Sequence, residues 1–283
     1  MDPPRARSWT LGRLAAGLLA VATISGVVLI PFYRPEAPLD SLESITGGIP
    51  WGWWWRSIHF WSAHAFLVVS LAHAIEVLIR RTETRLPVSI WWTTVFSVPV
   101  LIAAMLGGFV MRGDADATQA GSIWTALLNA FPHFGTELTA FFLGTDQSLT
   151  TVVTLHHVST FPLALWLITA LHAGPQWIEA RPVVIAALFS LSIAAILPPG
   201  LGPADLDPSR TVAGPWYFLG LQAALSVLPP SAAILFPVTA FLSAGVARHA
   251  IGNVRLAMLA VAGLMLVAWL FWTVWFLIST GAS

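Results

Sequence analysis

Long apolar stretches separated by short polar segments dominate this chain. Seven of them approach or exceed the roughly 20 residues that a helix needs to cross the hydrocarbon core of a bilayer. They lie at residues 11–32, 53–79, 88–111, 153–178, 182–198, 230–247 and 256–278. The pattern therefore predicts an all-α integral membrane protein with seven transmembrane helices. The first stretch has no small-residue cleavage site before its polar flank, so we interpret it as a retained helix and not as a signal peptide.

The composition agrees with a membrane protein and limits the chemistry. Of the 283 residues, 57% are hydrophobic and 9% are charged, which lies outside the usual composition of a soluble globular domain. The chain contains no cysteine. Disulfides, thiolate metal sites, cysteine-bound iron–sulfur clusters and thioether-linked haem are therefore excluded.

The arginines predict the orientation of the helices. A cytoplasmic N-terminus puts nine arginines inside and four outside, in agreement with the positive-inside rule. The inner set is Arg5, Arg7, Arg13, Arg80, Arg81, Arg85, Arg181, Arg248 and Arg255, and the outer set is Arg34, Arg56, Arg112 and Arg210. Most acidic residues fall outside, so the outer face is negative. This suits either the docking of a basic partner or a plain solvated loop surface.

The segments between the apolar stretches indicate how the chain is organised. Residues 34–51, 112–152 and 199–229 are long enough to form outer loops. Within the second of these, residues 122–144 are moderately apolar but interrupted by Pro132 and Gly135, which predicts a helical hairpin on the outer membrane surface. Histidines and interior polar groups become rare near residue 180, so we expect a division there.

Two apolar stretches carry histidines at helical spacing. Ligand-capable side chains inside a membrane span are costly and usually have a function. From His59 to His73 the helix turns about 40° short of four full turns, so the two histidines share a face about 21 Å apart along the axis. From His157 to His172 the offset is about 60°, whereas His156 is about 160° away from His172. Periodicity therefore selects His157.

The predicted topology brings these four histidines to two levels. The second and fourth helices run in the same direction, so His59 lies level with His157 near the outside, and His73 with His172 near the cytoplasm. Two bis-histidine pairs suit haem iron in electron transfer. Satisfied interior histidines or a proton relay are the alternatives, and zinc would need further donors. The remaining histidines are interpreted as interface or loop residues: His64, His133, His156 and His249.

Glycines and one arginine fit the same interpretation. Gly12 and Gly26 on the first helix repeat the spacing of His59 and His73, which would give a planar macrocycle clearance at two depths. Arg56 lies one turn before His59 and could pair with a haem propionate.

These residues occur in stretches that resemble cytochrome b of the quinol:cytochrome c and quinol:plastocyanin oxidoreductases. The matching stretches are FYRP at 32–35, GWWWRSIHFWSAH at 52–64, AFPHFGTELTAFF at 130–142, LHHVSTFP at 155–162 and PADLDPSRTVAGPWYFL at 203–219. The resemblance implies a four-helix dihaem bundle in residues 1–180, fused to a three-helix C-terminal part in residues 181–283 that is similar to the small fourth subunit of plastid-type complexes.

The resemblance also implies site residues and cofactors. Two haem b groups would bind, the low-potential one at His59 and His157 and the high-potential one at His73 and His172. The glycines facing them would be Gly12, Gly26 and Gly108, with Arg56 at the outer propionate. Quinone or quinol would be the substrate, and the family's Pro-Glu-Trp-Tyr motif corresponds to Gly214-Pro215-Trp216-Tyr217, in which Tyr217 is the expected catalytic residue.

The chain departs from the family at several of these positions. Pro215 stands where a glutamate usually accepts a quinol proton, and proline cannot act as a base. Glu76 stands where an arginine is usual, one turn after His73, which would lower the inner haem's potential unless Arg80 or Arg81 neutralises it. Thr94 replaces a glycine that the family has four helical turns before Gly108, and Met111-Arg112-Gly113 replaces the usual Leu-Pro turn.

The sequence thus predicts a dihaem cytochrome b subunit of a membrane respiratory or photosynthetic complex. It would exchange electrons between the quinone pool and a partner such as a Rieske protein or a c-type cytochrome, with Asp205, Asp207 or Glu137 as substitute proton acceptors. A non-bifurcating conduit to a multihaem, molybdenum or iron–sulfur partner is the alternative, and a non-haem transporter or scaffold is another. We expect a dimer in an energy-transducing membrane, such as the bacterial inner membrane, with lipid and no nucleic acid as further partners.

Overall fold

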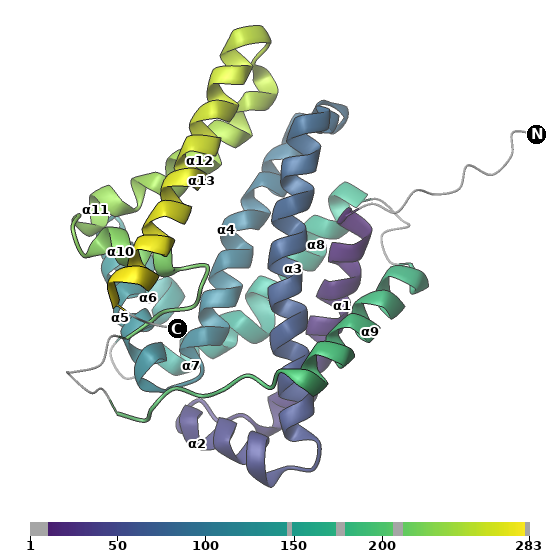
Figure 1. The fold of residues 1–283 in the computed structure, drawn as a ribbon, viewed down its shortest axis with the longest axis vertical. Helices are drawn as coiled ribbons and strands as arrows, with labels where there is room; N and C mark the ends of the chain where they lie inside the picture. Colours follow the sequence, from purple (N-terminus) through teal and green to yellow (C-terminus); the bar gives the residue numbers. More distant parts are fainter. Residues whose placement is uncertain (1–10, 146–148, 174–178, 206–211, 281–283) are drawn as a thin grey trace, which may run out of the picture. The chain divides into compact units, whose positions relative to one another are not determined.

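A computed structural model describes residues 11–145, 149–173, 179–205 and 212–280 (Figure 1). The described part of the chain is helical and contains no strand, which confirms the all-α prediction. The longer helices are α1 (Leu11–Leu29), α3 (Gly52–Arg80), α4 (Val88–Val110), α5 (Ala115–Asn129), α8 (Phe161–Ala173), α9 (Ala180–Ile196), α12 (Leu235–Val246) and α13 (Gly252–Thr280). The shorter ones are α2 (Pro38–Glu43), α6 (Gly135–Leu143), α7 (Leu149–Leu155), α10 (Leu219–Leu225) and α11 (Pro230–Ala233).

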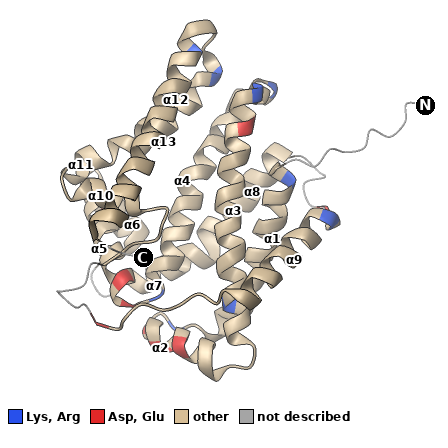
Figure 2. Ribbon diagram, in the orientation of Figure 1, with Lys and Arg blue, Asp and Glu red and all other residues tan. Residues whose placement is uncertain are grey.

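The apolar stretches form the expected helices. Within the described residues, six helical segments are long and apolar enough to cross a membrane, and α9 is a seventh, shorter apolar helix of 17 residues. The fourth segment begins earlier than predicted, at Leu149, and its predicted end at residues 174–178 lies outside the described residues. Charged residues of the long helices lie near the helix ends, with uncharged ribbon between them (Figure 2). This distribution suits a hydrocarbon environment.

The chain folds as two compact units that alternate along the sequence. The first contains α1, α3, α4 as far as Met105, α8 and α9. The second contains the end of α4 from Leu106, then α5, α6, α7 and α10 to α13, together with Arg34–Asp40. The predicted division into residues 1–180 and 181–283 is drawn from the resemblance of these two parts to two separate subunits of plastid-type complexes. It stays a prediction.

The first unit is organised around the small residues of α1. Helices α1, α3 and α9 pack against one another (Figure 1), and the buried side of α1 includes Ala15, Ala16, Leu18 and Leu19. A Cβ on Gly17 would come within 2.7 Å of the Pro182 carbonyl oxygen, so glycine is needed for the close approach of α1 and α9. Close packing through small residues is a common way for helices to associate in membranes.

The second unit holds the predicted hairpin. Helices α5 and α6 pack together, and the Thr139 hydroxyl donates to the Asn129 side-chain oxygen at 2.8 Å across the turn. The hairpin is therefore present, although α5 begins at Ala115, well before the predicted start at position 122. Its position on a membrane surface stays a prediction. In the C-terminal part, α13 packs against α12 and α10.

Candidate functional site

Two contacts between α1 and α3 repeat at the spacing predicted from the sequence. A Cβ added to Gly26 would lie 3.0 Å from Cε1 of His59, and one added to Gly12 would lie 2.9 Å from Nε2 of His73. Both distances are shorter than ordinary van der Waals contacts. Glycine is therefore what lets each imidazole approach the α1 backbone, at two levels that are equally spaced on the two helices.

Hydrogen bonds from Nδ1 orient two of the imidazoles. Nδ1 of His59 lies 2.9 Å from the Ala22 carbonyl oxygen, and Nδ1 of His172 lies 3.0 Å from the Ile168 carbonyl oxygen. A carbonyl only accepts, so these nitrogens carry the proton and Nε2 is the unprotonated nitrogen. This is the tautomer that a histidine needs to bind a metal through Nε2.

His73 has a different neighbour. Its buried Nδ1 makes no hydrogen bond among the described residues and lies 3.9 Å from a carboxylate oxygen of Glu76, one turn further along α3. The side chain also interacts electrostatically with His172, which belongs to the same unit. The two residues predicted to form the inner pair therefore lie in the same unit, and their pairing stays a prediction.

His157 sits in an irregular part of its helix. Residues His156–Thr160 form a π-helical turn between α7 and α8. A π turn inserts about one extra residue into an α-helix and often marks a functional position. The prediction treats this helix as regular, and the π turn explains why its two histidines are spaced one position further apart than those on α3. A Cβ on Gly108 would lie 2.7 Å from Cε1 of His157, so this imidazole also meets a glycine.

His64 and His156 make other contacts. Nδ1 of His64 lies 2.8 Å from the Phe60 carbonyl oxygen, and its ring packs at a 32° tilt against Phe60 with centroids 4.0 Å apart. His156 is buried, with Nε2 2.8 Å from the Phe141 carbonyl oxygen and Nδ1 3.1 Å from the Thr160 hydroxyl. Both ring nitrogens of His156 thus lie within hydrogen-bonding distance of groups in the protein.

The residues present fit haem. Three imidazoles rest on backbone that lacks a Cβ, and in two of the four predicted ligands Nδ1–H donates to a backbone carbonyl. A flat macrocycle needs close access to the backbone, and haem iron needs axial imidazole nitrogens with free lone pairs. In the described residues, no three His, Asp or Glu side chains form a group that could hold a bare metal ion.

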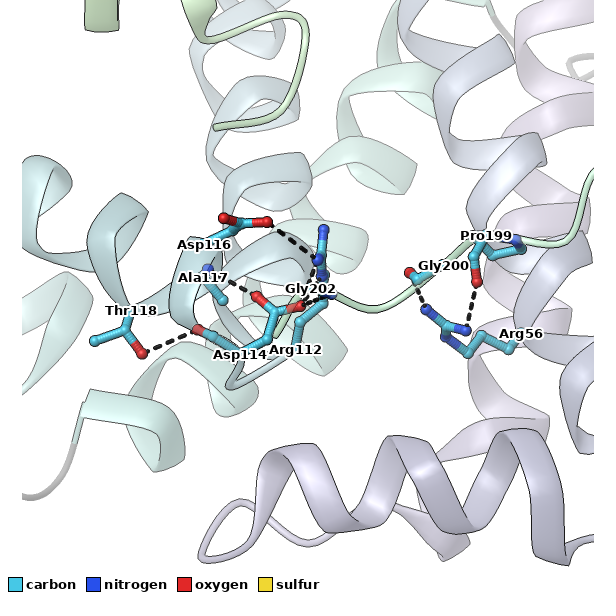
Figure 3. Close-up of polar contacts among 9 residues, drawn as sticks. All are labelled: Arg56, Arg112, Asp114, Asp116, Ala117, Thr118, Pro199, Gly200 and Gly202. Carbon is cyan, nitrogen blue, oxygen red and sulfur yellow. Dashed lines mark hydrogen bonds and ion pairs between the residues drawn. The ribbon is translucent and has the colours of Figure 1, made fainter. Parts of the chain in front are cut away.

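The Arg56 guanidinium hydrogen-bonds to backbone carbonyls of the segment that follows α9. Its Nη1 donates to the Pro199 carbonyl oxygen at 2.8 Å and its Nη2 to the Gly200 carbonyl oxygen at 3.0 Å (Figure 3). Nη1 is also 3.4 Å from the Thr46 hydroxyl. Arg56 therefore fixes the segment that follows α9, a role that sequence reasoning missed because backbone carbonyls leave no signature in the sequence.

A buried ionic cluster in the second unit was not predicted either. Asp114 is fully buried; it caps α5 by accepting from the Ala117 amide at 2.9 Å, and it accepts from the Gly202 amide at 2.8 Å (Figure 3). Nε of Arg112 donates to the same carboxylate at 2.8 Å. Asp114 thus joins the start of α5 to the segment before the predicted quinol motif. The signal available in the sequence was an aspartate at a helix start.

The predicted quinol motif lies at the start of α10. Pro215 is buried, and its carbonyl accepts from the Phe218 amide at 2.7 Å. Gln222 holds the segment before the motif, accepting from the Gly214 amide at 2.8 Å and donating to the Val212 carbonyl at 2.6 Å. Burial raises the pKa of the Tyr217 phenol, and the charge of Arg112 opposes that rise. Tyr217 therefore stays protonated, and its hydroxyl is able to donate a hydrogen bond.

Of the acids predicted to replace the motif glutamate, the two that the structure describes are not buried. Asp205 and Glu137 are exposed, and Asp207 lies outside the described residues. A cavity of about 450 Å³ opens beside α5, lined by Val110, Gly113, Ala117, Thr118, Gly121, Ser122, Thr125, Leu149 and Thr150. Its polar lining consists of hydroxyl groups, and none of these nine residues is an acid or a histidine.

Comparison with known proteins identifies relatives of the chain. A cytochrome b of the snake Pantherophis bairdi is 27% identical over 161 residues, covering 55% of this chain and 43% of the relative. A cytochrome b of the yeast Schizosaccharomyces japonicus is 25% identical over 260 residues, covering 78% and 66%. A cytochrome b/c1 of Bradyrhizobium diazoefficiens is 23% identical over 259 residues, covering 78% and 38%. The chain thus spans less than two thirds of the length of each of these relatives.

The fold and the family agree with these similarities. A solved chain from a hyperthermophilic respiratory Complex III aligns with a TM-score of 0.64 at 19% identity, covering 96% of this chain and 91% of that one. The sequence profile described as Cytochrome b/b6/petB matches residues 3–174, more than half of the chain. This membership implies haem binding. The protein is therefore an integral membrane member of the cytochrome b/b6 family.

Proposed function

We propose that this chain is a dihaem cytochrome b subunit that moves electrons across a membrane between the quinone pool and a redox partner. His59 and His157 would hold the outer haem b, and His73 and His172 the inner one. Haem held by these histidines would supply reversible one-electron transfer.

One observation carries the proposal: the glycine–histidine contact between α1 and α3 occurs twice, at Gly26–His59 and Gly12–His73. A single imidazole against a glycine could be a packing detail. Two such contacts at the same spacing on both helices would stack two sites along the membrane normal, about 21 Å apart. The third contact, Gly108–His157, would supply the matching side of the outer site.

The proposal extends to the surroundings of the chain. We expect it to work as a dimer inside a multisubunit redox complex, with its N-terminus in the cytoplasm of a bacterium and lipid around α13, whose surface is largely exposed and apolar. Support comes from the Complex III chain of similar fold and from the arginine distribution.

The test is to purify the complex that contains this chain and to measure haem per chain, with a redox titration of the reduced-minus-oxidised spectrum. We expect two haem b per chain and two separate midpoint potentials. A colourless, folded protein would instead support the transporter or scaffold alternative. His64→Ala serves as a control, because His64 is bonded within its own helix and its replacement should leave both haems in place.

A second candidate function is favoured by the residues around the quinol motif. Pro215 supplies no base, Asp205 and Glu137 are exposed, and the cavity beside α5 has no titratable lining residue. Quinol oxidation that sends its two electrons to different acceptors needs an efficient proton acceptor. We therefore propose as the alternative a non-bifurcating conduit to a multihaem, molybdenum or iron–sulfur partner.

Reduction by quinol separates the two candidates. The complex is reduced with a short-chain quinol after the Rieske iron–sulfur protein, if one co-purifies, has been removed. Reduction of both haems at an unchanged rate would support the conduit, and dependence on the Rieske protein would support bifurcation. Tyr217→Phe sharpens the result, because loss of the phenol donor should raise the KM for quinol if the motif still binds the quinol headgroup.

A further inference from the structure

Glu76 is the single acidic residue on the six long apolar helices of the described chain. A carboxylate in such a helix is expensive to keep away from water, so it usually has a partner and a function. Glu76 is about 29% exposed, and it lies on α3 between His73 and Arg80, one turn from each. No hydrogen bond that stabilises the fold depends on its contact with His73, because the two groups are 3.9 Å apart.

The two oxygens of Glu76 face different partners. Oε2 faces Nδ1 of His73 at 3.9 Å, and Oε1 accepts from Nε of Arg80 at 3.1 Å. The carboxylate therefore lies between an imidazole and a guanidinium. Arg80 is about 69% exposed, so its charge is partly screened by solvent, whereas the His73 nitrogen is buried. The side of the carboxylate facing His73 feels the lower dielectric.

This arrangement distinguishes His73 from the other oriented histidines. His59 and His172 present Nδ1 to neutral backbone carbonyls at 2.9 and 3.0 Å. Only His73, among these three, presents Nδ1 to a carboxylate. A carboxylate behind a ligating imidazole makes the imidazole a stronger electron donor and adds negative charge near the metal, and both effects stabilise the oxidised metal.

We propose that Glu76 is a positioning and tuning residue for the inner haem, and that Arg80 sets how strongly it acts by sharing the carboxylate. The inference rests on the proposed function, because it requires haem at His73. By its negative charge on the Nδ1 side of His73, Glu76 favours the tautomer in which Nδ1 carries the proton and Nε2 faces iron, and it lowers the potential of the inner haem. Arg80 offsets part of that charge, so the two side chains act in opposite directions on the same centre.

The experiment compares three variants in the purified haem-loaded complex. Glu76→Gln keeps the shape of the side chain and removes its charge, so the midpoint potential of the inner haem should rise. At a fixed ambient potential the ratio of oxidised to reduced inner haem should fall about tenfold. Arg80→Gln leaves Glu76 uncompensated, so the inner potential should fall. Arg81→Gln removes an adjacent charge of the same sign, and its effect should be smaller than that of Arg80→Gln. The outer haem serves as an internal reference and should not shift.

Two further measurements keep the outcome decisive. In the double variant Glu76→Gln/Arg80→Gln the effect of Arg80→Gln should disappear, because its partner is gone. The low-spin ferric electron paramagnetic resonance signal of the inner haem should also change in Glu76→Gln, since the environment of its axial imidazole changes. If Glu76→Gln fails to load the inner haem, Arg80→Gln still carries the test, because it retains the carboxylate.

The possible failures are distinguishable. A wild-type complex without two haems would overturn the proposed function itself. Two haems with an inner potential that is unchanged in Glu76→Gln, or that rises in Arg80→Gln, would overturn only this inference. An equal shift of both haems would overturn it as well, because it would indicate a general effect of net charge.

Discussion

The Gly26–His59 and Gly12–His73 contacts between α1 and α3, which lie at the proposed outer and inner levels, repeat one structural plan with different electrostatics. At both levels a glycine of α1 admits an imidazole of α3. At the outer level the imidazole of His59 is oriented by the Ala22 carbonyl, and at the inner level that of His73 faces the Glu76 carboxylate. The helices thus supply equivalent access at two depths, while one neighbouring side chain makes the two positions chemically unequal.

The comparison shows that two features of each site are determined by different residues. Access to the backbone is set by the glycine spacing and cannot differ much between levels without changing the helix packing. The electronic character of each histidine is set by the acceptor at Nδ1, which a single substitution can change. Two centres of unequal potential can therefore arise from one repeated contact, which suits directional electron transfer across a membrane.

The largest expected effect comes from removing one histidine at a time. His59→Ala should abolish the outer haem and His73→Ala the inner one, each leaving half of the haem content, because an iron with one axial imidazole is held weakly. Haem per chain and the remaining midpoint potential provide the measurement. Loss of both haems in either variant, with the protein still folded, would show that the two levels do not act as separate sites.

A smaller effect is expected from filling the glycine positions. A Cβ on Gly12 or Gly26 would come within 2.9 or 3.0 Å of an imidazole atom, and overpacking of this kind costs about 1–3 kcal/mol. Gly12→Val should therefore reduce occupancy of the inner haem and Gly26→Val that of the outer haem, as measured by haem content and by the thermal unfolding midpoint. Gly263→Val on α13 is the matched control, because no atom lies within 4 Å of its added Cβ.

Arg56 tests whether the outer level depends on the segment after α9. Its guanidinium donates to the carbonyls of Pro199 and Gly200. A hydrogen bond from a charged group contributes about 1.5–3 kcal/mol to the stability of a folded protein. Arg56→Gln should make this segment more sensitive to limited proteolysis and leave the inner haem unchanged. A shift of the outer midpoint alone, without new cleavage, would instead favour the propionate role predicted from the sequence.

The helices were predictable from the sequence because hydrocarbon demands long apolar helices, and that demand is visible in composition alone. The shared spacing of the histidines and glycines was visible for the same reason, since α3 is regular. The π turn at His156–Thr160 was not, because the prediction uses a constant rotation per residue and no local residue type announces the extra residue. The contact of Arg80 with Glu76, one of two neutralising partners considered, is confirmed by the 3.1 Å distance.

The polar contacts of the outer segments were the least predictable. Arg56 binds backbone carbonyls, and Asp114 binds backbone amides as well as Arg112. Every residue offers such backbone groups, so their choice depends on the tertiary fold and not on sequence pattern. The acidic residues of the outer loops predict a general negative surface, whereas Asp114 is fully buried and structural.

The smallest change in midpoint potential is expected for a substitution at Ser25, next to the His59 level. Its buried hydroxyl donates to the carbonyls of Val21 and Ala22 at 2.7 and 3.1 Å, and the Ala22 carbonyl is also the acceptor for His59. Ser25→Ala leaves that carbonyl to His59 alone, so the imidazole should become a slightly stronger donor and the outer midpoint potential should fall. The shift should be smaller than that of the inner haem in Glu76→Gln, because a neutral dipole changes and not a charge. Ser190→Ala on α9 provides the control, because its buried hydroxyl donates to the Ala186 carbonyl of its own helix at 2.8 Å. An outer potential that rises in Ser25→Ala would mean that the hydroxyl, which lies 3.4 Å from Nδ1, orients His59 in place of the carbonyl.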